Sequence, residues 1–182
     1  MPGFVVQTPT ALSRQAALNA AQTRDASIDD STLKNGDLWD IVRPLNDAMN
    51  IAEGEARYRD SVANFSKEQR AAHAVIWYVS DVQNGGHWQF FYNSTGILWE
   101  AAQKGLRDIG AGENALILSG AALRAGGSPP FELAPRQSLM KRLSPKFADL
   151  DERLNNTDPL KLLWDYVRAN RAAFYYASPK TA

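Results

Sequence analysis

The helices expected in this chain meet at residues 81–96, which read DVQNGGHWQFFYNSTG. The Asn-Gly-Gly sequence at 84–86 predicts the end of a helix, because a glycine just past the last turn can take the left-handed conformation that satisfies exposed carbonyls. Trp88, Phe91 and Tyr92 follow at i, i+3 and i+4, the spacing of a short helix that buries its aromatic side chains. The stretch therefore predicts two helices joined by a tight glycine turn.

Upstream of this turn, apolar residues recur at helical spacing. Residues 38–49 carry one such stripe, and Pro44 within it is expected to bend or divide the helix because proline lacks a donor N–H. Residues 53–65 predict a second helix. Ser66 and Gln69 have the spacing of a capping box, which predicts that the helix leading to the glycine turn begins there.

Downstream of the turn, the same reading gives three more helices and a loop. Residues 98–109 form an apolar stripe, and residues 113–125 predict the next helix. In that second helix, Leu116 and Leu123, with small alanines between them, are expected to continue the apolar stripe. Residues 126–145 begin with Gly-Gly-Ser-Pro-Pro and predict a long surface loop. An amphipathic pattern over residues 160–174 predicts a final helix.

These patterns contain no convincing pair of strands and no internal repeat. They predict an all-α fold, a single compact domain of about seven or eight helices over residues 28–182. Residues 1–27 are rich in Ala, Gln, Thr and Ser and predict a flexible amino-terminal arm.

Composition restricts the function further. The 182 residues include no cysteine, which excludes disulfides and thiolate chemistry. The formal net charge is zero, which argues against a protein that coats nucleic acid or an anionic membrane. No apolar run is long enough for a signal sequence or a membrane span, so we expect no membrane association and a cytoplasmic location.

Few residues suggest catalysis or metal binding. His73 and His87 have no second ligand within one turn, which favours structural or surface roles because a catalytic zinc site needs about three protein ligands. Asp149, Asp151 and Glu152 form the densest acidic cluster, but nearby Lys and Arg residues favour a solvated charged segment. The chain has neither a nucleophile elbow nor a Walker lysine. We therefore expect no metal and no cofactor, and we favour a non-catalytic protein over an enzyme.

Aromatic residues are dense between Trp77 and Trp99. Residues 76–103 contain no lysine or arginine, whereas Asp81 and Glu100 are present. Base stacking on single-stranded nucleic acid normally combines aromatics with cations. The pattern therefore favours core packing or a protein interface, and it predicts no direct binding of nucleic acid.

Charge is uneven along the chain. Residues 25–60 hold nine acids and four bases, a net charge of −5, so the remainder carries +5. The candidate acidic interaction face consists of Asp37, Asp40, Asp47, Glu53 and Glu55. Such a face either attracts a basic protein surface or is simply solvated.

The sequence of residues 81–96, followed at a fixed interval by Ile109-Gly110-Ala111, resembles the signature of a bacterial family of helical domains. The founding studied member of that family is a DNA mimic, and most of the family has no assigned activity. The resemblance is specific over residues 66–127 and weaker over 28–65 and 145–176. It implies an all-α fold and, in the mimic, an acidic surface, often presented by a dimer, that occupies a DNA-binding protein in place of DNA.

Two hypotheses follow. The first is a non-catalytic binding or regulatory protein whose acidic face engages a basic or DNA-binding protein, and such a protein can act as a homodimer. Because the net charge is zero, any mimicry of DNA is restricted to the acidic segment. The second is a small-molecule-binding protein or enzyme with a polar pocket lined by Asn84, Gln89, Asn93 and Ser94. The signature residues either line that pocket or only hold the fold. They are Asn84, Gly85, Gly86, Trp88, Gln89, Phe90, Phe91, Asn93 and Ser94.

Overall fold

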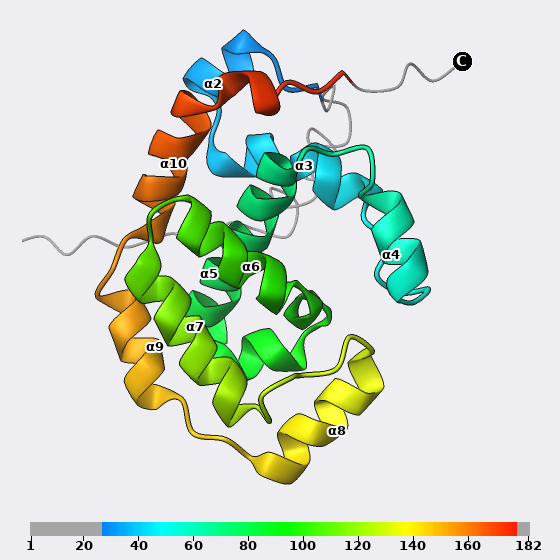
Figure 1. Cartoon of the computed structure of the whole chain (residues 1–182), viewed down its shortest axis with the longest axis vertical. Coiled ribbons are helices and arrows are strands. Elements are labelled where there is room, and N and C mark those ends of the chain that lie inside the picture. Colours follow the sequence, from blue (N-terminus) through cyan, green and yellow to red (C-terminus); the bar gives the residue numbers. More distant parts are fainter. Residues whose placement is uncertain (1–26, 178–182) are drawn as a thin grey trace, which may run out of the picture.

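The computed structural model describes residues 27–177, which form nine α-helices and two short 3-10 helices (Figure 1). The α-helices are α2 (Asp30–Asn35), α3 (Leu38–Ala48), α4 (Glu55–Ser61), α5 (Lys67–Tyr92), α6 (Trp99–Asp108), α7 (Gly112–Arg124), α8 (Leu133–Leu143), α9 (Ala148–Asn155) and α10 (Pro159–Ala169). The 3-10 helices are η1 (Ser94–Leu98) and η2 (Arg171–Ala173). Extended pairing in the described range is one isolated antiparallel bridge between Ile28 and Tyr176, so the predicted all-α class is confirmed.

The predicted arm at residues 1–27 lies, apart from Ser27, outside the described residues, and so do residues 178–182. The domain boundary at 28–182 therefore stays a prediction. Near the first described residues, the side chains of Arg171 and Tyr175 both donate to Asp30, the tyrosine hydroxyl at 2.6 Å. These bonds and the bridge hold the two ends of the described chain together.

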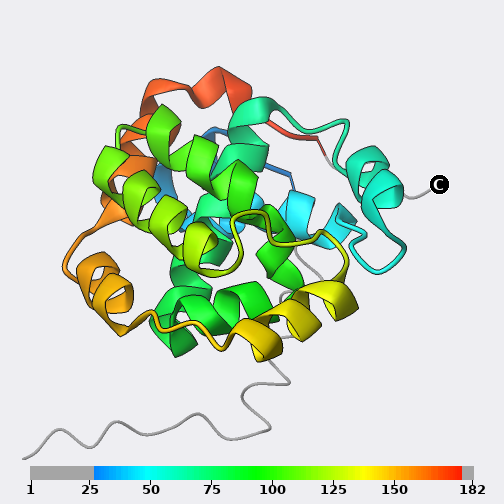
Figure 2. The same cartoon turned by 60° about the horizontal axis from the view of Figure 1, so that its bottom comes forward.

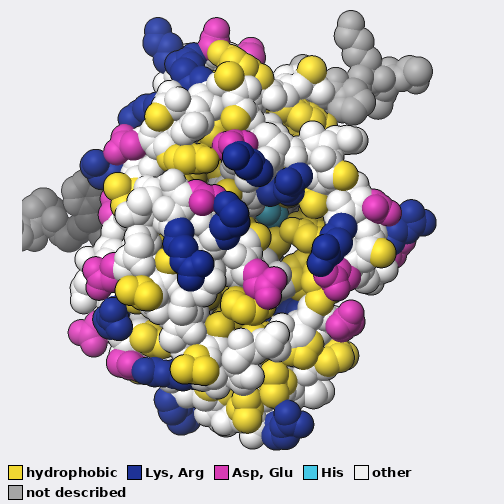
Figure 3. All heavy atoms as spheres, in the orientation of Figure 1, with side chains coloured by type: hydrophobic (Ala, Val, Ile, Leu, Met, Phe, Trp, Pro, Cys, Tyr) yellow, Lys and Arg dark blue, Asp and Glu magenta, His cyan; other side chains and the backbone are white. Residues whose placement is uncertain are grey.

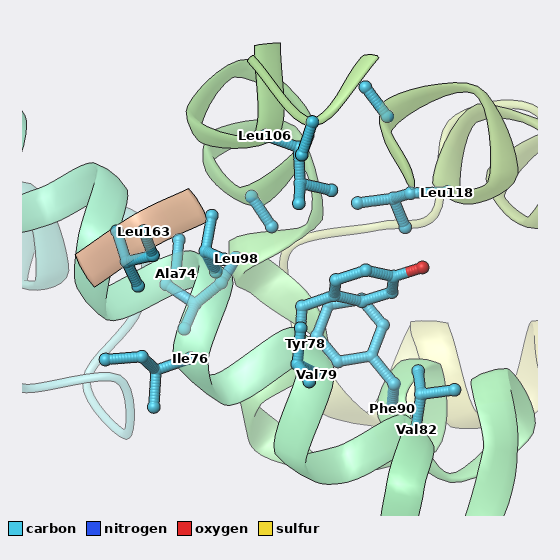
Figure 4. Packing of buried hydrophobic residues seen from close by; sticks show 14 of the residues in the cluster. Ala74, Ile76, Tyr78, Val79, Val82, Phe90, Leu98, Leu106, Leu118 and Leu163 are labelled. Carbon is cyan, nitrogen blue, oxygen red and sulfur yellow. The ribbon is translucent and has the colours of Figure 1, made fainter. Parts of the chain in front are cut away.

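Helix α5 is the centre of the fold. It begins at the predicted capping box, in which Gln69 N donates to Ser66 Oγ at 3.0 Å and Ser66 N donates to Gln69 Oε1 at 2.9 Å. Its neighbours are α3, α6, α8, α9 and α10, which surround it (Figure 2). Side chains from α6, α7 and α10 converge on those of α5 in a continuous apolar core (Figure 4).

The predicted glycine turn divides α5 into two helical segments. Gly85 (φ −163°, ψ 23°) and Gly86 (φ 75°, ψ 176°) leave helical geometry, and the positive φ is at Gly86. In a straight helix, twelve residues would separate Asp81 from Asn93 by about 18 Å. Asn93 Nδ2 instead lies 3.0 Å from Asp81 Oδ1, so the second segment folds back beside the first.

The aromatic face of the second segment differs from the prediction. Phe90 and Phe91 are fully buried, but Trp88 is 39% exposed and stacks on Tyr92 with ring centroids 4.5 Å apart. The helix restarts after Gly86 with the His87 side chain directed inward, so positions 87, 90 and 91 face the core. Phe91 was expected there; burial of Trp88 was predicted wrongly.

The predicted loop at residues 126–145 contains helix α8. The sequence shows no apolar stripe there because one of its inward side chains is Arg136, which is fully buried. Its guanidinium donates to the backbone carbonyls of Phe91 (2.9 Å), Asn93 (2.8 Å), Ser94 (3.2 Å), Pro130 (2.8 Å) and Phe131. Arg136 thus fastens α8 to the carboxyl end of α5, where helix carbonyls lack intrahelical donors.

Three further expectations were wrong in part. Pro44 lies inside α3 without dividing it. Helices α4 and α10 are shorter than the predicted 53–65 and 160–174. Leu116 and Leu123 of α7 are 69% and 74% exposed, because the inward face of α7 is formed by Ile117, Leu118 and alanines on the other side of the helix.

Candidate functional site

Behind the glycine turn lies a buried chain of hydrogen bonds. His87 Nδ1 lies 2.5 Å from Asp151 Oδ1, His87 N donates to the same oxygen at 2.8 Å, and His87 Nε2 lies 2.9 Å from the Tyr78 hydroxyl. A neutral imidazole protonated at Nδ1 satisfies both contacts, since Nε2 then accepts from Tyr78. Burial lowers the pKa of His87, and the hydrogen bond to Asp151 opposes this shift. The arrangement joins α5 to α9 and gives His87 a structural role.

The other histidine is also internal. His73 is 1% exposed, and its Nε2 atom has no hydrogen-bond partner in the structure. Burial lowers its pKa to about 4. The acids of the cluster Asp149, Asp151 and Glu152 have separate partners. Asp149 binds Arg124 in a bidentate pair at 2.6 and 2.7 Å, whereas Asp151 binds His87. Over residues 27–177, no three His, Asp or Glu side chains converge as metal ligands.

The polar signature residues lie in different surroundings. Asp81 is buried and accepts hydrogen bonds from Asn93 and Thr95. Asn84 is exposed at the turn, whereas Ser94, also exposed, follows the end of α5. The predicted pocket of Asn84, Gln89, Asn93 and Ser94 stays a prediction; the structure brings Ser94 into a different hollow, described below.

The five candidate acids have local partners. Asp37 and Asp40 form a capping box at the start of α3, in which Asp37 Oδ1 accepts from the backbone of Trp39 and Asp40. The other three acids pair with arginines one helical turn away: Asp47 with Arg43 at 3.7 Å, Glu53 with Arg57 at 3.6 Å, and Glu55 with Arg59. Acids and arginines therefore alternate on this segment.

A groove separates α4 from the body of the protein (Figure 3). Three adjoining pockets of about 480, 440 and 200 Å³ compose it, and Ile97 and Phe131 line all three; we call this hollow the α4 groove. One wall comes from the segment around α4, which itself has no buried residue. The other wall comes from η1, the start of α6 and the segment before α8.

The three pockets differ in chemistry. The largest is mainly apolar, with Ile51, Ile97, Phe131 and Leu133 joined by Ser94, Glu132 and Arg136. The middle pocket is mixed, with Glu55, Arg59, Arg70 and Glu100 among its lining residues. The smallest holds Glu55 and Glu100 beside Trp99, Ile97, Phe131, Ser128, Pro129 and Pro130. Apolar surface thus lies beside three carboxylates and three arginines along the groove. The arginines already have partners in the protein, since Arg59 pairs with Glu55 while Arg70 and Arg136 donate to backbone carbonyls.

Several groove residues were missed from the sequence, above all Ile97, Phe131 and Glu132. Trp99 belongs to the aromatic stretch for which core packing or a protein interface was expected, and Glu100 stands in the stretch 76–103 that contains no lysine or arginine. The rest depends on tertiary structure, since the groove combines residues that lie far apart in the chain.

No helix in the described part of the chain is long and apolar enough to cross a membrane. No curated protein and no solved structure matches the chain. A model of the DMP19-like protein family matches residues 63–170, which is more than half of the chain and includes the body side of the α4 groove but not α4 itself. The chain therefore belongs to the DMP19-like protein family.

Proposed function

We propose that this protein is non-catalytic and regulates a basic protein partner by binding it along the α4 groove and the adjacent acidic face. The observation that carries the proposal is the groove itself: an apolar floor that includes Ile97 and Phe131, with the carboxylates of Glu55, Glu100 and Glu132 along it. Interfaces of this kind combine apolar anchor sites with charged surroundings that steer the partner.

Membership of the DMP19-like family supports a partner that binds DNA, since the family's studied member is a DNA mimic. The charges support a local form of mimicry. Duplex DNA presents about one negative charge per 1.7 Å of axis, whereas this chain has no net charge and its acidic segment alternates acids with Arg43, Arg57 and Arg59. A basic partner would have to replace these arginines as the counter-charges of Asp47, Glu53 and Glu55.

The test uses variants that leave helix caps intact. Asp37 and Asp40 are unsuitable because they form the α3 capping box. The variant Asp47→Asn/Glu53→Gln/Glu55→Gln removes three exposed carboxylates, each paired one turn away. The control Glu113→Gln/Glu152→Gln/Asp165→Asn changes the net charge by the same amount on α7, α9 and α10.

Proteins retained from native lysate by the tagged chain at low salt and lost at high salt would be purified, and their affinity measured by calorimetry. We expect the acidic-face variant to bind more weakly than the control variant, and duplex DNA to compete for the partner. Equal affinity of the two variants at low salt would reject the acidic face. A partner unaffected by DNA would reject mimicry.

A small-molecule site is the second candidate, favoured by the largest pocket. Its volume of about 480 Å³ lies within the range of about 300–1,000 Å³ typical of ligand sites. Ser94 is the residue that it shares with the polar pocket predicted at the glycine turn. A compound that raises the unfolding temperature of the wild type but not of Ile97→Trp would support this candidate.

A further inference from the structure

The smallest of the three pockets has a chemistry of its own. Its charged lining residues are Glu55, from the first turn of α4, and Glu100, from the first turn of α6. No lysine or arginine lines it, although Arg59 and Arg70 line the pocket next to it. Trp99 and Phe131 add aromatic surface.

We propose that this pocket is a subsite for the cationic side chain of an arginine in the partner, with an apolar partner residue in the adjoining largest pocket. This inference rests on the proposed function and specifies the partner segment that the groove takes. Two carboxylates on different elements suit a guanidinium, which presents N–H donors in a planar fork.

The ion pairs around the pocket leave its charge available. Glu100 has no ion-pair partner among residues 27–177, and the partner of Glu55 is Arg59, one turn away on the same exposed helix. Exposed pairs of this kind contribute little, so an incoming cation can replace Arg59 at small cost. An anion would meet two carboxylates, which disfavours a phosphate or a nucleic acid here.

Size and aromatic surface point to a single side chain. The volume of about 200 Å³ is below the roughly 300 Å³ at which sites for whole small molecules begin. A guanidinium beside Trp99 or Phe131 also gains from interaction with the aromatic ring. Because Ile97 and Phe131 line both this pocket and the largest one, neighbouring partner residues can fill the two together.

The probe is a pair of dipeptides, acetyl-Leu-Arg-amide and acetyl-Leu-citrulline-amide, which differ in charge at almost constant shape. We would titrate each into the ¹⁵N-labelled full chain and follow the Trp99 indole and the amides of Glu100 and Phe131. We expect saturable shifts with the arginine peptide that weaken at high salt, and affinity lower by about fivefold with the citrulline peptide.

Glu100→Gln should lower the affinity for the arginine peptide by a similar factor, and Glu152→Gln on α9 should leave it unchanged. Equal affinities for the two peptides, or full affinity in Glu100→Gln, would overturn the subsite. The acidic-face variant changes Glu55, a residue of the subsite, so the two proposals are separated with Asp47→Asn/Glu53→Gln, which keeps both Glu55 and Glu100. If the arginine peptide binds but the purified partner has the same affinity for this double variant as for the wild type, the subsite stands and the proposed function fails. If the double variant weakens the partner complex but no arginine-specific shift occurs, the function stands and the subsite fails.

Discussion

Substitution of Gly86 by alanine adds a single methyl group and should be among the most destabilising changes of that size in this protein. Gly86 adopts φ 75° and ψ 176°, a region that residues other than glycine rarely enter. An added Cβ would also lie 2.6 Å from Asp151 Oδ2. That carboxylate cannot move freely, because its other oxygen accepts from the backbone and ring nitrogens of His87.

Two contributions set the size of the effect. Backbone strain in this region costs about 1–3 kcal/mol. Displacement of Asp151 leaves donors of the buried His87 without an acceptor, which costs about 1–3 kcal/mol more. Gly86→Ala should therefore lower the free energy of unfolding by about 4 kcal/mol, a large part of the total of about 5–15 kcal/mol typical of a domain.

Denaturant unfolding followed by circular dichroism measures this change. The matched control is Gly110→Ala, since Gly110 also has a positive φ (82°) but an added Cβ there meets no atom within 4 Å. We expect the control to lose only about 1–2 kcal/mol through strain. In an Asp151→Ala background the clash is absent, so Gly86→Ala should there cost only the backbone strain of about 1–3 kcal/mol. A Gly86→Ala cost equal to that of Gly110→Ala in the wild type, or an unchanged cost in the Asp151→Ala background, would refute the reasoning.

Two further predictions concern buried polar groups. The pKa of His73 is lowered from 6.5 to about 4 in the folded protein, so the unfolded chain takes up the proton first and the stability present above pH 6.5 is lost as the pH falls toward 4. Between pH 7 and about pH 4.5 this loss is about 2 kcal/mol, and His73→Leu should reduce the pH dependence of urea unfolding by that amount; an identical pH dependence would contradict it. Arg136→Met should lower the free energy of unfolding by about 3 kcal/mol or more and speed hydrogen exchange of the α8 amides, since several buried carbonyls lose their donor. Arg136→Lys should restore little of this stability, because an ammonium group cannot reach all of these carbonyls. Equal protection of the α8 amides in Arg136→Met and in the wild type would contradict the prediction.

Local signals were read correctly from the sequence. The Ser66–Gln69 capping box and the glycine turn depend on residues within one or two turns of one another, and both are present in the structure. Helix α8 was missed because one of its two buried side chains is an arginine whose acceptors at Phe91, Asn93 and Ser94 come from more than forty residues earlier in the chain. Periodicity of apolar residues carries no information about such a contact.

The candidate site was predicted less well than the fold. The acids of the 25–60 segment were identified, but their arginine partners and the capping role of Asp37 and Asp40 are matters of geometry. The α4 groove was not foreseen, because Glu55, Glu100 and Phe131 come from three separate segments. Leu116 and Leu123 show the opposite error, since their apolar side chains suggested a core position that Ile117, Leu118 and alanines of the same helix occupy.

The two walls of the α4 groove have different origins along the chain. The body wall, which includes Ile97, Glu100 and Phe131, falls within residues 63–170, the range of the family model, whereas α4 precedes that range. Helix α4 has no buried residue, but its Tyr58 packs, partly buried, against the core. The other positions of residues 55–61 can be varied: substitutions that keep Tyr58 and Ser61, whose hydroxyl accepts from Asn50 N, should retarget the groove to new peptides while the core that folds the protein is left unaltered.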